Sequence, residues 1–128
     1  MSDIKSPAIT NINYQFVWHT KHKVAFLESV MRVRLRELLI QDCNARGIVV
    51  LSGGNIGNSY VHIKLLCPPN FSPSDIMKQL KGRSSRLLQI EFPSLKNKGI
   101  GGSIWNSGYF CASFGAETHN DLQAYLNG

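Results

Sequence analysis

The chain has 128 residues, the size of one domain, and 43% of them are hydrophobic, which is enough to bury a core. Its formal net charge of +6, from 14 basic and 8 acidic residues, favours a polyanionic partner without deciding the fold. Three cysteines with no Cys-x-x-Cys pair argue against zinc and for a reducing, cytoplasmic location, and no apolar run approaches the roughly 20 residues of a membrane span.

We expect a single domain over residues 1–128, with residues 1–11 polar and flexible, because no repeat or linker divides the chain. Residues 14–19 alternate with aromatic side chains on one face, which predicts a strand. Residues 27–46 carry apolar side chains at helical spacing, and Gly47 follows where a left-handed cap is expected.

A β-hairpin is predicted next. The short β-branched run 48–51 and the strand 60–67 are separated by residues 52–58, which are rich in glycine and predict a flexible loop. In the second strand, Tyr60 and His62 fall on the same face as Lys64, because side chains alternate along a strand.

A second helix is predicted from Ser72, as its N-cap, to about Ile90. Pro73 stands at the first helical position, Asp75 lies in the first turn, and Pro93 stops the helix.

Residues 96–104 predict a mobile basic loop, residues 109–114 a last strand, and Thr118 the cap of a short final helix that carries Tyr125. The order is βαββαβ with one extra helix. It predicts an α+β, ferredoxin-like fold, in which two helices cover one face of an antiparallel sheet.

Cations and hydroxyls gather in the second helix and suggest contacts to a phosphate backbone. An ordinary solvated helix face is the alternative interpretation. Candidate DNA-binding residues are Lys21, Lys23, Lys78, Lys81, Arg83, Ser85 and Arg86, with further cations at His22, Lys96 and Lys98.

Several aromatic side chains are candidates for stacking on unpaired bases, although aromatic residues in a chain of this size are more often part of the core. They are Trp18, Tyr60, Trp105 and Tyr109. Trp105 stands beside the glycine-rich loop and is the one that we expect to be exposed. From the residues alone, Tyr125 is a half-buried packing residue.

Six separated segments together resemble one family, the single-tyrosine HUH transposases of small bacterial insertion sequences (IS200-like), to which REP-associated tyrosine transposases are related. The resemblance is collinear over about residues 12–127. It rests on Tyr14–Lys21, Tyr60–Leu65, Leu80–Arg86 with Glu91-Phe92-Pro93, Ile104–Phe110, Ser113–Gly115 and Tyr125.

The resemblance implies a mechanism. Two histidines that flank one hydrophobic residue would bind Mg²⁺ or Mn²⁺, and a tyrosine on the last helix would attack the scissile phosphate to give a 5′-phosphotyrosine and a free 3′-OH. It makes Tyr125 the nucleophile and His62 a metal ligand. It also implies a cytoplasmic homodimer with merged sheets and a hairpin or single-stranded DNA partner, with neither a membrane nor a small-molecule substrate.

This chain departs from the family pattern at the metal motif. Tyr60 replaces the first histidine, and a phenol with an ordinary pKa near 10 is a poor ligand for a hard cation. Ser59 replaces a frequent acidic residue. The sequence ends at Gly128, before the position of a further polar ligand that family members often carry, so we expect at least two of the three protein ligands to be missing.

Three hypotheses follow from the sequence. The chain is an active transposase with a modified metal site, a transposase-derived protein that binds hairpin or single-stranded DNA as a dimer but cleaves it poorly or not at all, or an RNA-binding sheet protein that shares only the fold.

Overall fold

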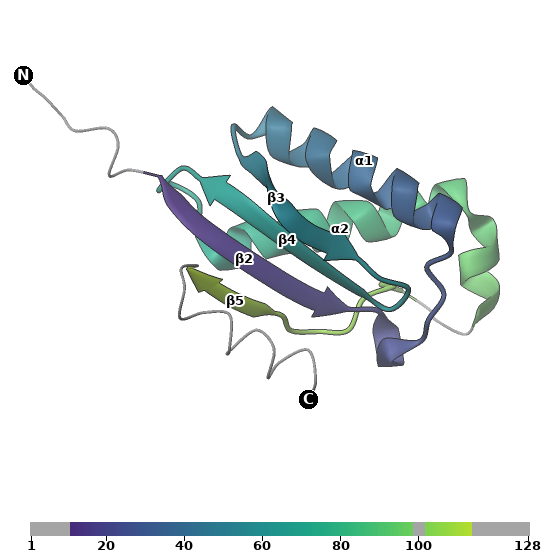
Figure 1. The fold of residues 1–128 in the computed structure, drawn as a ribbon. Coiled ribbons are helices and arrows are strands. Elements are labelled where there is room, and N and C mark those ends of the chain that lie inside the picture. Colours follow the sequence, from purple (N-terminus) through teal and green to yellow (C-terminus); the bar gives the residue numbers. More distant parts are fainter. Residues whose placement is uncertain (1–10, 99–101, 114–128) are drawn as a thin grey trace, which may run out of the picture.

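The computed structural model describes residues 11–98 and 102–113 (Figure 1). Its described strands and two long helices follow one another in the order β-α-β-β-α-β. They are β2 (Ile12–His19), α1 (Ser29–Ala45), β3 (Val49–Ile56), β4 (Tyr60–Cys67), α2 (Pro73–Glu91) and β5 (Phe110–Ser113). Two short 3₁₀ helices, η2 (Lys21–Lys23) and η3 (Pro93–Lys98), complete the described elements.

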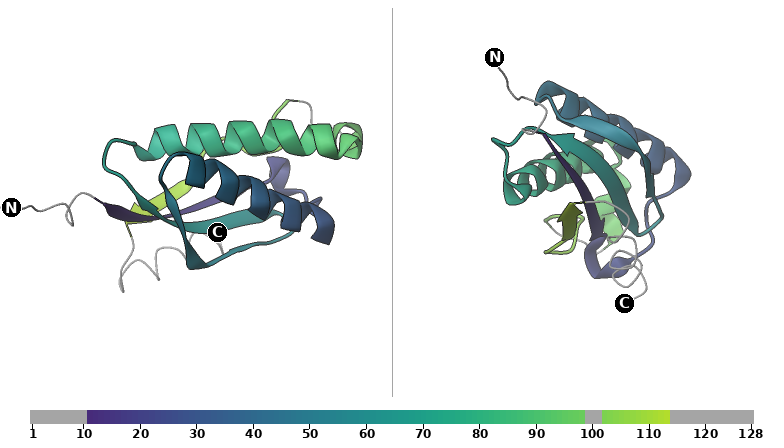
Figure 2. Two further views of the ribbon diagram at one scale, coloured as in Figure 1. Left: turned by 90° about the horizontal axis from the view of Figure 1, so that it is seen from above. Right: turned by 60° about the vertical axis from the view of Figure 1, so that its left-hand side comes forward.

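The strands form one antiparallel sheet in the order β3-β4-β2-β5, so β2, the first described strand, lies inside the sheet. Both helices cover the same face of this sheet, and its other face carries no described helix (Figures 1 and 2). The predicted α+β, ferredoxin-like arrangement is therefore confirmed. The predicted final helix and its Tyr125 lie outside the described residues.

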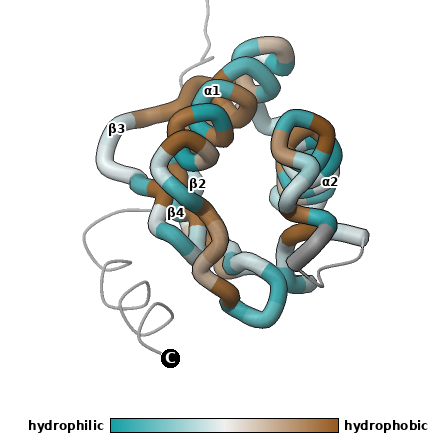
Figure 3. The backbone as a smooth tube through the Cα atoms, turned by 90° about the vertical axis from the view of Figure 1, so that its right-hand side faces the viewer, coloured by the Kyte–Doolittle hydropathy of each residue, from teal (hydrophilic) through white to brown (hydrophobic). Residues whose placement is uncertain are grey.

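The core lies between the sheet and the helices. On the helix-facing side of the central strands, Phe16, Trp18, Val61 and Leu65 are fully buried. Figure 3 shows that α1 and α2 each mix hydrophobic with hydrophilic stretches, as expected of helices that bury one side. The buried residues recur three or four positions apart, as one side of a helix requires. They include Met31, Leu35 and Leu38 in α1, and Ile76, Leu80 and Ser84 in α2.

The start of α2 follows its sequence signals closely. Ser72 is extended and its Oγ accepts a hydrogen bond from the Asp75 backbone N–H at 3.2 Å, which satisfies one of the free donors of the first turn. Pro73 occupies the first turn, and the helix ends before Phe92. At the end of α1, Gly47 has a φ of +73°, the left-handed conformation predicted there.

The predicted loop over residues 52–58 is wrong for most of its length, because β3 continues to Ile56. The strand stays paired with β4 through an irregularity between Leu51 and Asn55, where the register shifts. Glycine allows this approach: a Cβ at Gly54 would lie 2.4 Å from the carbonyl oxygen of His62. The glycines therefore serve a close strand pairing, not a flexible connection.

The predicted mobile loop and the predicted flexible start of the chain lie partly or almost wholly outside the described residues. Of the predicted mobile loop 96–104, the first residues belong to η3, and residues 99–101 lie outside the described chain. The flexible start over residues 1–11 lies almost wholly outside it too. Within the described ranges, the helices are too short or too polar to cross a membrane.

Candidate functional site

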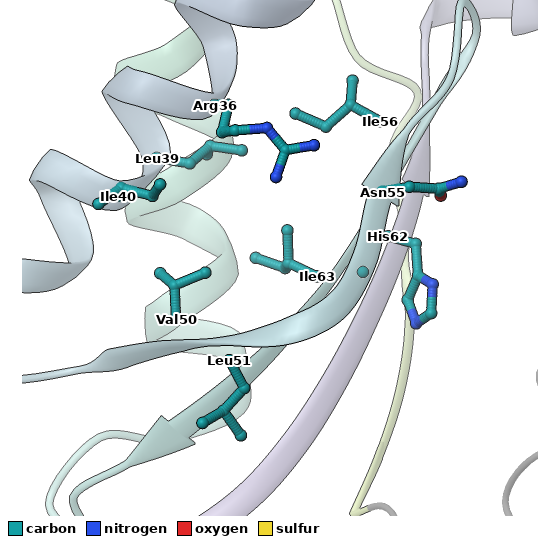
Figure 4. Close-up of a pocket in the computed structure, with 10 residues that line it drawn as sticks. Arg36, Leu39, Ile40, Val50, Leu51, Asn55, Ile56, His62 and Ile63 are labelled. Carbon is teal, nitrogen blue, oxygen red and sulfur yellow. The ribbon is translucent and has the colours of Figure 1, made fainter.

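His62 lies on the face of the sheet that the helices leave open. In β4, the neighbouring Val61 and Ile63 join the core, whereas the ring of His62 projects to the other side (Figure 4). A cavity of about 30 Å³ between α1 and β3 is bordered by His62 and by core residues such as Leu39 and Ile63. The imidazole itself points away from the helices, as the strand alternation predicted.

A hydrogen bond fixes the His62 ring against the neighbouring strand. Its Nε2 lies 3.1 Å from Oε1 of Gln15 in β2. Because an amide oxygen only accepts, Nε2 carries the proton in this arrangement. Both side chains are buried, with 8% of His62 and 2% of Gln15 exposed.

The imidazole of His62 is kept neutral. Burial, and then the positive charge of Lys64 two residues along the same strand, lower the pKa of His62 below its ordinary value. A neutral imidazole has a nitrogen lone pair to offer, so this environment suits a metal ligand or a proton acceptor.

Tyr60 occupies the motif position next to His62 but lies in a different setting. It pairs across the sheet with His19, and the two rings are 6.5 Å apart. Its ring also covers the turn at Gly57, where a Cβ would lie 2.3 Å from Tyr60 Cε1. The phenol therefore packs on the hairpin turn.

The neighbouring His19 also has a lowered pKa. Burial of the ring is the larger cause, and the positive charge of Lys23 is the second.

The described residues offer few donors for the divalent cation that the family resemblance implies. Within residues 11–98 and 102–113, no three His, Cys, Asp or Glu side chains are grouped so as to hold a metal. One neutral imidazole, at His62, and one adjacent amide oxygen, at Gln15, are nevertheless ligand types that divalent cations accept. The described residues could therefore hold a divalent cation, but with only these two protein donors.

The candidate phosphate-binding residues of α2 lie on the other side of the sheet from the His62 ring (Figures 2 and 4). Lys78 and Arg86 are exposed, and Arg83 is half-buried. The structure does not bring these cations together with His62 within one described face. Lys21 and Lys23 lie in η2, directly after β2; Lys23 is exposed and Lys21 is half-buried.

Two candidate phosphate contacts in α2 point their polar groups inward. Nζ of Lys81 donates to the backbone carbonyls of Asn106, at 2.8 Å, and Gly108, at 2.9 Å. Oγ of Ser85 is buried and accepts the Ile104 backbone N–H at 3.0 Å. These two side chains fasten α2 to the segment that leads into β5.

Trp105 is not exposed, and the prediction that it would be is wrong. Only 2% of its surface is accessible, its indole N–H donates to Ser84 Oγ at 3.0 Å, and its ring meets that of Trp18 edge-on. A backbone bridge to Thr20 holds the same segment to the end of β2. Its position beside glycines suggested a loop tip, whereas the indole fills the space between α2 and the sheet.

An exposed groove runs beside the C-terminal half of α2. It has a volume of about 370 Å³ and is lined in part by Arg86, Gln89, Lys96 and Ser103. Two cations and several polar groups make this the described concavity best suited to a phosphate. Sequence reasoning missed Gln89 and, on the other face, Gln15. The signal available for Gln15 was its place between Tyr14 and Phe16, on the face of the strand opposite these aromatic side chains.

Comparisons with known proteins agree with this architecture. A family model described as "Transposase IS200 like" matches residues 8–128. The ISDra2 transposase TnpA of Deinococcus radiodurans is 26% identical, over 92% of this chain and 84% of the relative. The transposase for insertion sequence element IS200 of Salmonella typhimurium is 30% identical, over 98% of this chain and 83% of the relative.

Solved structures give the same result. A candidate transposase from Deinococcus radiodurans R1 superposes with a TM-score of 0.84 at 26% identity, covering 99% of this chain and 96% of that one. A REP-associated tyrosine transposase bound to a REP hairpin shares the fold, with a TM-score of 0.62 at 13% identity over 99% and 69% of the two chains. This chain belongs to the IS200-like transposase family.

Proposed function

We propose that this transposase binds the hairpin or single-stranded DNA ends of an insertion sequence, and that it cleaves and rejoins them through a 5′-phosphotyrosine at Tyr125. The observation that carries the proposal is the neutral imidazole of His62 on the open face of the sheet, at the position of the family's metal motif. The chain's family membership supplies the reaction class.

In this reaction, the Tyr125 phenolic oxygen forms a bond to the scissile phosphorus while the bond from phosphorus to the 3′ oxygen breaks. The phenol gives up its proton, and the departing 3′ oxygen takes one up as a hydroxyl. Because one phosphoester replaces another, the attack of a second 3′-OH can reverse the step without an external energy source.

His62 would hold the Mg²⁺ or Mn²⁺ that the family implies. When bound, that cation would polarise the scissile phosphate and stabilise the charge that develops on it. The contribution of this chain is to present a neutral nitrogen at a fixed place on a rigid strand, since Gln15 restrains the ring.

DNA binding would use the exposed cations of the described surface. Lys23 follows β2, Lys78 and Arg86 lie on α2, and Lys96 lines the groove with Arg86. The REP-associated relative is a hairpin complex, which supports a hairpin as the ligand type. A homodimer with merged sheets belongs to the same proposal, since β3 and β5 are the two edges of the sheet that the described residues form, and a sheet can extend through its edges.

A second candidate function is DNA binding with impaired cleavage. It is favoured by a specific observation: Tyr60 replaces a motif histidine and packs on the hairpin turn at Gly57. The exposed cations on α2 would serve this function equally well.

The two functions are separated by incubation with a library of hairpin-bearing oligonucleotides and Mn²⁺. The proposed function predicts a covalent protein–DNA band that resists denaturation, disappears in Tyr125→Phe and persists in the matched control Tyr14→Phe. Gel shifts without a covalent band, together with a band that first appears in Tyr60→His, would instead establish the binding protein. Binding that does not weaken with salt would contradict both, because phosphate contacts release counterions.

A further inference from the structure

Gln15 and His62 form a donor pair on two neighbouring strands of the open face. Gln15 is in β2 and His62 in β4, and the strand register places them diagonally, with Val17 opposite His62 and Lys64 opposite Gln15. Both belong to the centre of the sheet, where backbone pairing on either side holds them in place. Tyr60 takes no part in this pair.

The spacing of the two donor atoms matches the geometry of a metal site. Oε1 of Gln15 lies 3.1 Å from Nε2 of His62. Two ligand atoms at right angles around an octahedral cation, with bonds of about 2.1 Å, lie about 3 Å apart. This separation would therefore allow both atoms to bind one divalent cation, which would lie to the side of the line that joins them.

The chemistry of the pair is also suitable. An amide oxygen is a hard neutral donor of the kind that Mg²⁺ and Mn²⁺ accept, and an imidazole nitrogen adds affinity for Mn²⁺. Burial of both side chains limits their rotation, so few conformations are lost on binding. A phenol at position 60 would have to lose a proton first.

We propose that Gln15, through Oε1, is the second protein ligand of the divalent cation that His62 binds through Nε2. The assignment rests on the proposed function, because it concerns the same metal site. Binding requires the Nε2 proton to leave that atom, and a neutral imidazole carries it on Nδ1 instead. Coordination is thus coupled to a change of the His62 tautomer, with no net release of a proton.

The test is a Mn²⁺ titration of the full chain without DNA, followed by electron paramagnetic resonance of the free ion. Gln15→Leu should weaken binding at least about tenfold, as loss of a metal ligand or its support commonly does. His62→Ala should weaken it as much, and the double variant no further, because neither donor holds the ion alone. Gln15→Glu should bind more tightly, and Gln79→Leu, an exposed glutamine of α2, is the matched control.

A second measurement does not depend on whether the variants fold. Long-range proton–nitrogen spectra of the wild-type chain should show a protonated His62 Nε2 without metal, and an unprotonated Nε2 when Mg²⁺ is added. Unchanged Mn²⁺ affinity in a folded Gln15→Leu, or a Nε2 that keeps its proton at saturating Mg²⁺, would overturn the assignment.

The outcomes also separate this inference from the proposed function. If the covalent DNA band forms but Gln15→Leu binds Mn²⁺ as the wild type does, the ligand assignment fails alone. If Mn²⁺ binds through Gln15 and His62 but no band forms with any hairpin, the assignment holds and the cleavage activity fails.

Discussion

Lys78 and Lys81 show how two lysines one turn apart in α2 can have different functions. Lys78 is exposed, whereas Nζ of Lys81 spans two backbone carbonyls of the segment before β5. Burial lowers the pKa of Lys81, which means that the protein spends free energy to keep this ammonium partly out of water. The two carbonyls offset that cost. Lys81 is therefore a structural tether in the described chain.

This difference predicts opposite consequences for the same substitution. Lys81→Met should lower the free energy of unfolding by about 1–2 kcal/mol, since it removes charged hydrogen bonds from a partly exposed site and leaves two carbonyls to find other donors. Lys78→Met should leave the stability near that of the wild type and weaken DNA binding. Urea denaturation and gel shifts on both variants check this. A Lys81→Met chain of full stability would refute the tether.

The two helices are connected on their outer side by an ion pair. Nε of Arg34 in α1 lies 2.7 Å from Oε1 of Glu91 in α2, and Nη2 of Arg34 lies 2.9 Å from Oε2 of Glu91, so the pair is bidentate. Arg34 also bonds Glu37 within its own helix at 3.1 Å. Glu91 is the last residue of α2, so this contact fixes the far end of that helix against α1.

The pair predicts a stability difference that depends on pH. Hydrogen bonding to Arg34 lowers the pKa of Glu91 below its ordinary 4.5. A lowered carboxyl pKa contributes stability that is present above the ordinary value and lost as the pH falls through the folded one. Glu91→Gln should therefore melt at a lower temperature than the wild type at pH 7, by a small margin for an exposed pair, and the difference should be smaller at about pH 2. Thermal melts at both values, with Glu37→Gln as the control within one helix, test this; equal melting of Glu91→Gln and wild type at pH 7 would contradict it.

At the scale of elements, local signals explain what the sequence could predict. The strand β4 alternates strictly, and α2 begins with a cap, a proline and an acidic residue, so both boundaries follow from neighbouring residues. The extent of β3 could not be predicted from its own residues. Its glycine at position 54 lies close to the backbone of another strand at His62, and the local sequence gives no sign of that contact. Trp105 likewise depends on partners at Trp18 and Ser84 that lie far away in sequence.

The candidate site shows the same division. The open-face position of His62 follows from the alternation of β4 alone, and the structure confirms it. Its contact with Gln15 could not be predicted, since it requires the register between β2 and β4. The role of Tyr125 stays a prediction, because that residue lies outside the described chain.

At the scale of the whole molecule, charge and chemistry are distributed over two faces. The His62 ring lies on the open face of the sheet (Figure 4), and α2, which carries the exposed cations, covers the opposite face (Figure 2). A single DNA segment lying flat on one face cannot contact both. The proposed DNA would either bend around an edge of the sheet or meet the two faces in different copies of a dimer. In both cases the cations provide affinity and His62 provides chemistry, and the two contributions can be separated.

The salt dependence of DNA binding measures this separation. Each phosphate contact that a cation makes adds about 0.7 to the slope of log K against log salt for single-stranded DNA and about 0.9 for a duplex, because it releases condensed counterions. Arg86→Gln should therefore reduce the slope for a hairpin by about 0.7–0.9 and weaken binding to every hairpin sequence alike. His62→Ala should leave the slope unchanged, because burial and Lys64 keep its imidazole neutral, while it abolishes the covalent band. Titrations of a fluorescent hairpin at several salt concentrations supply both slopes. A slope that falls in His62→Ala but not in Arg86→Gln would mean that the DNA is held by the open face of the sheet, with α2 uninvolved.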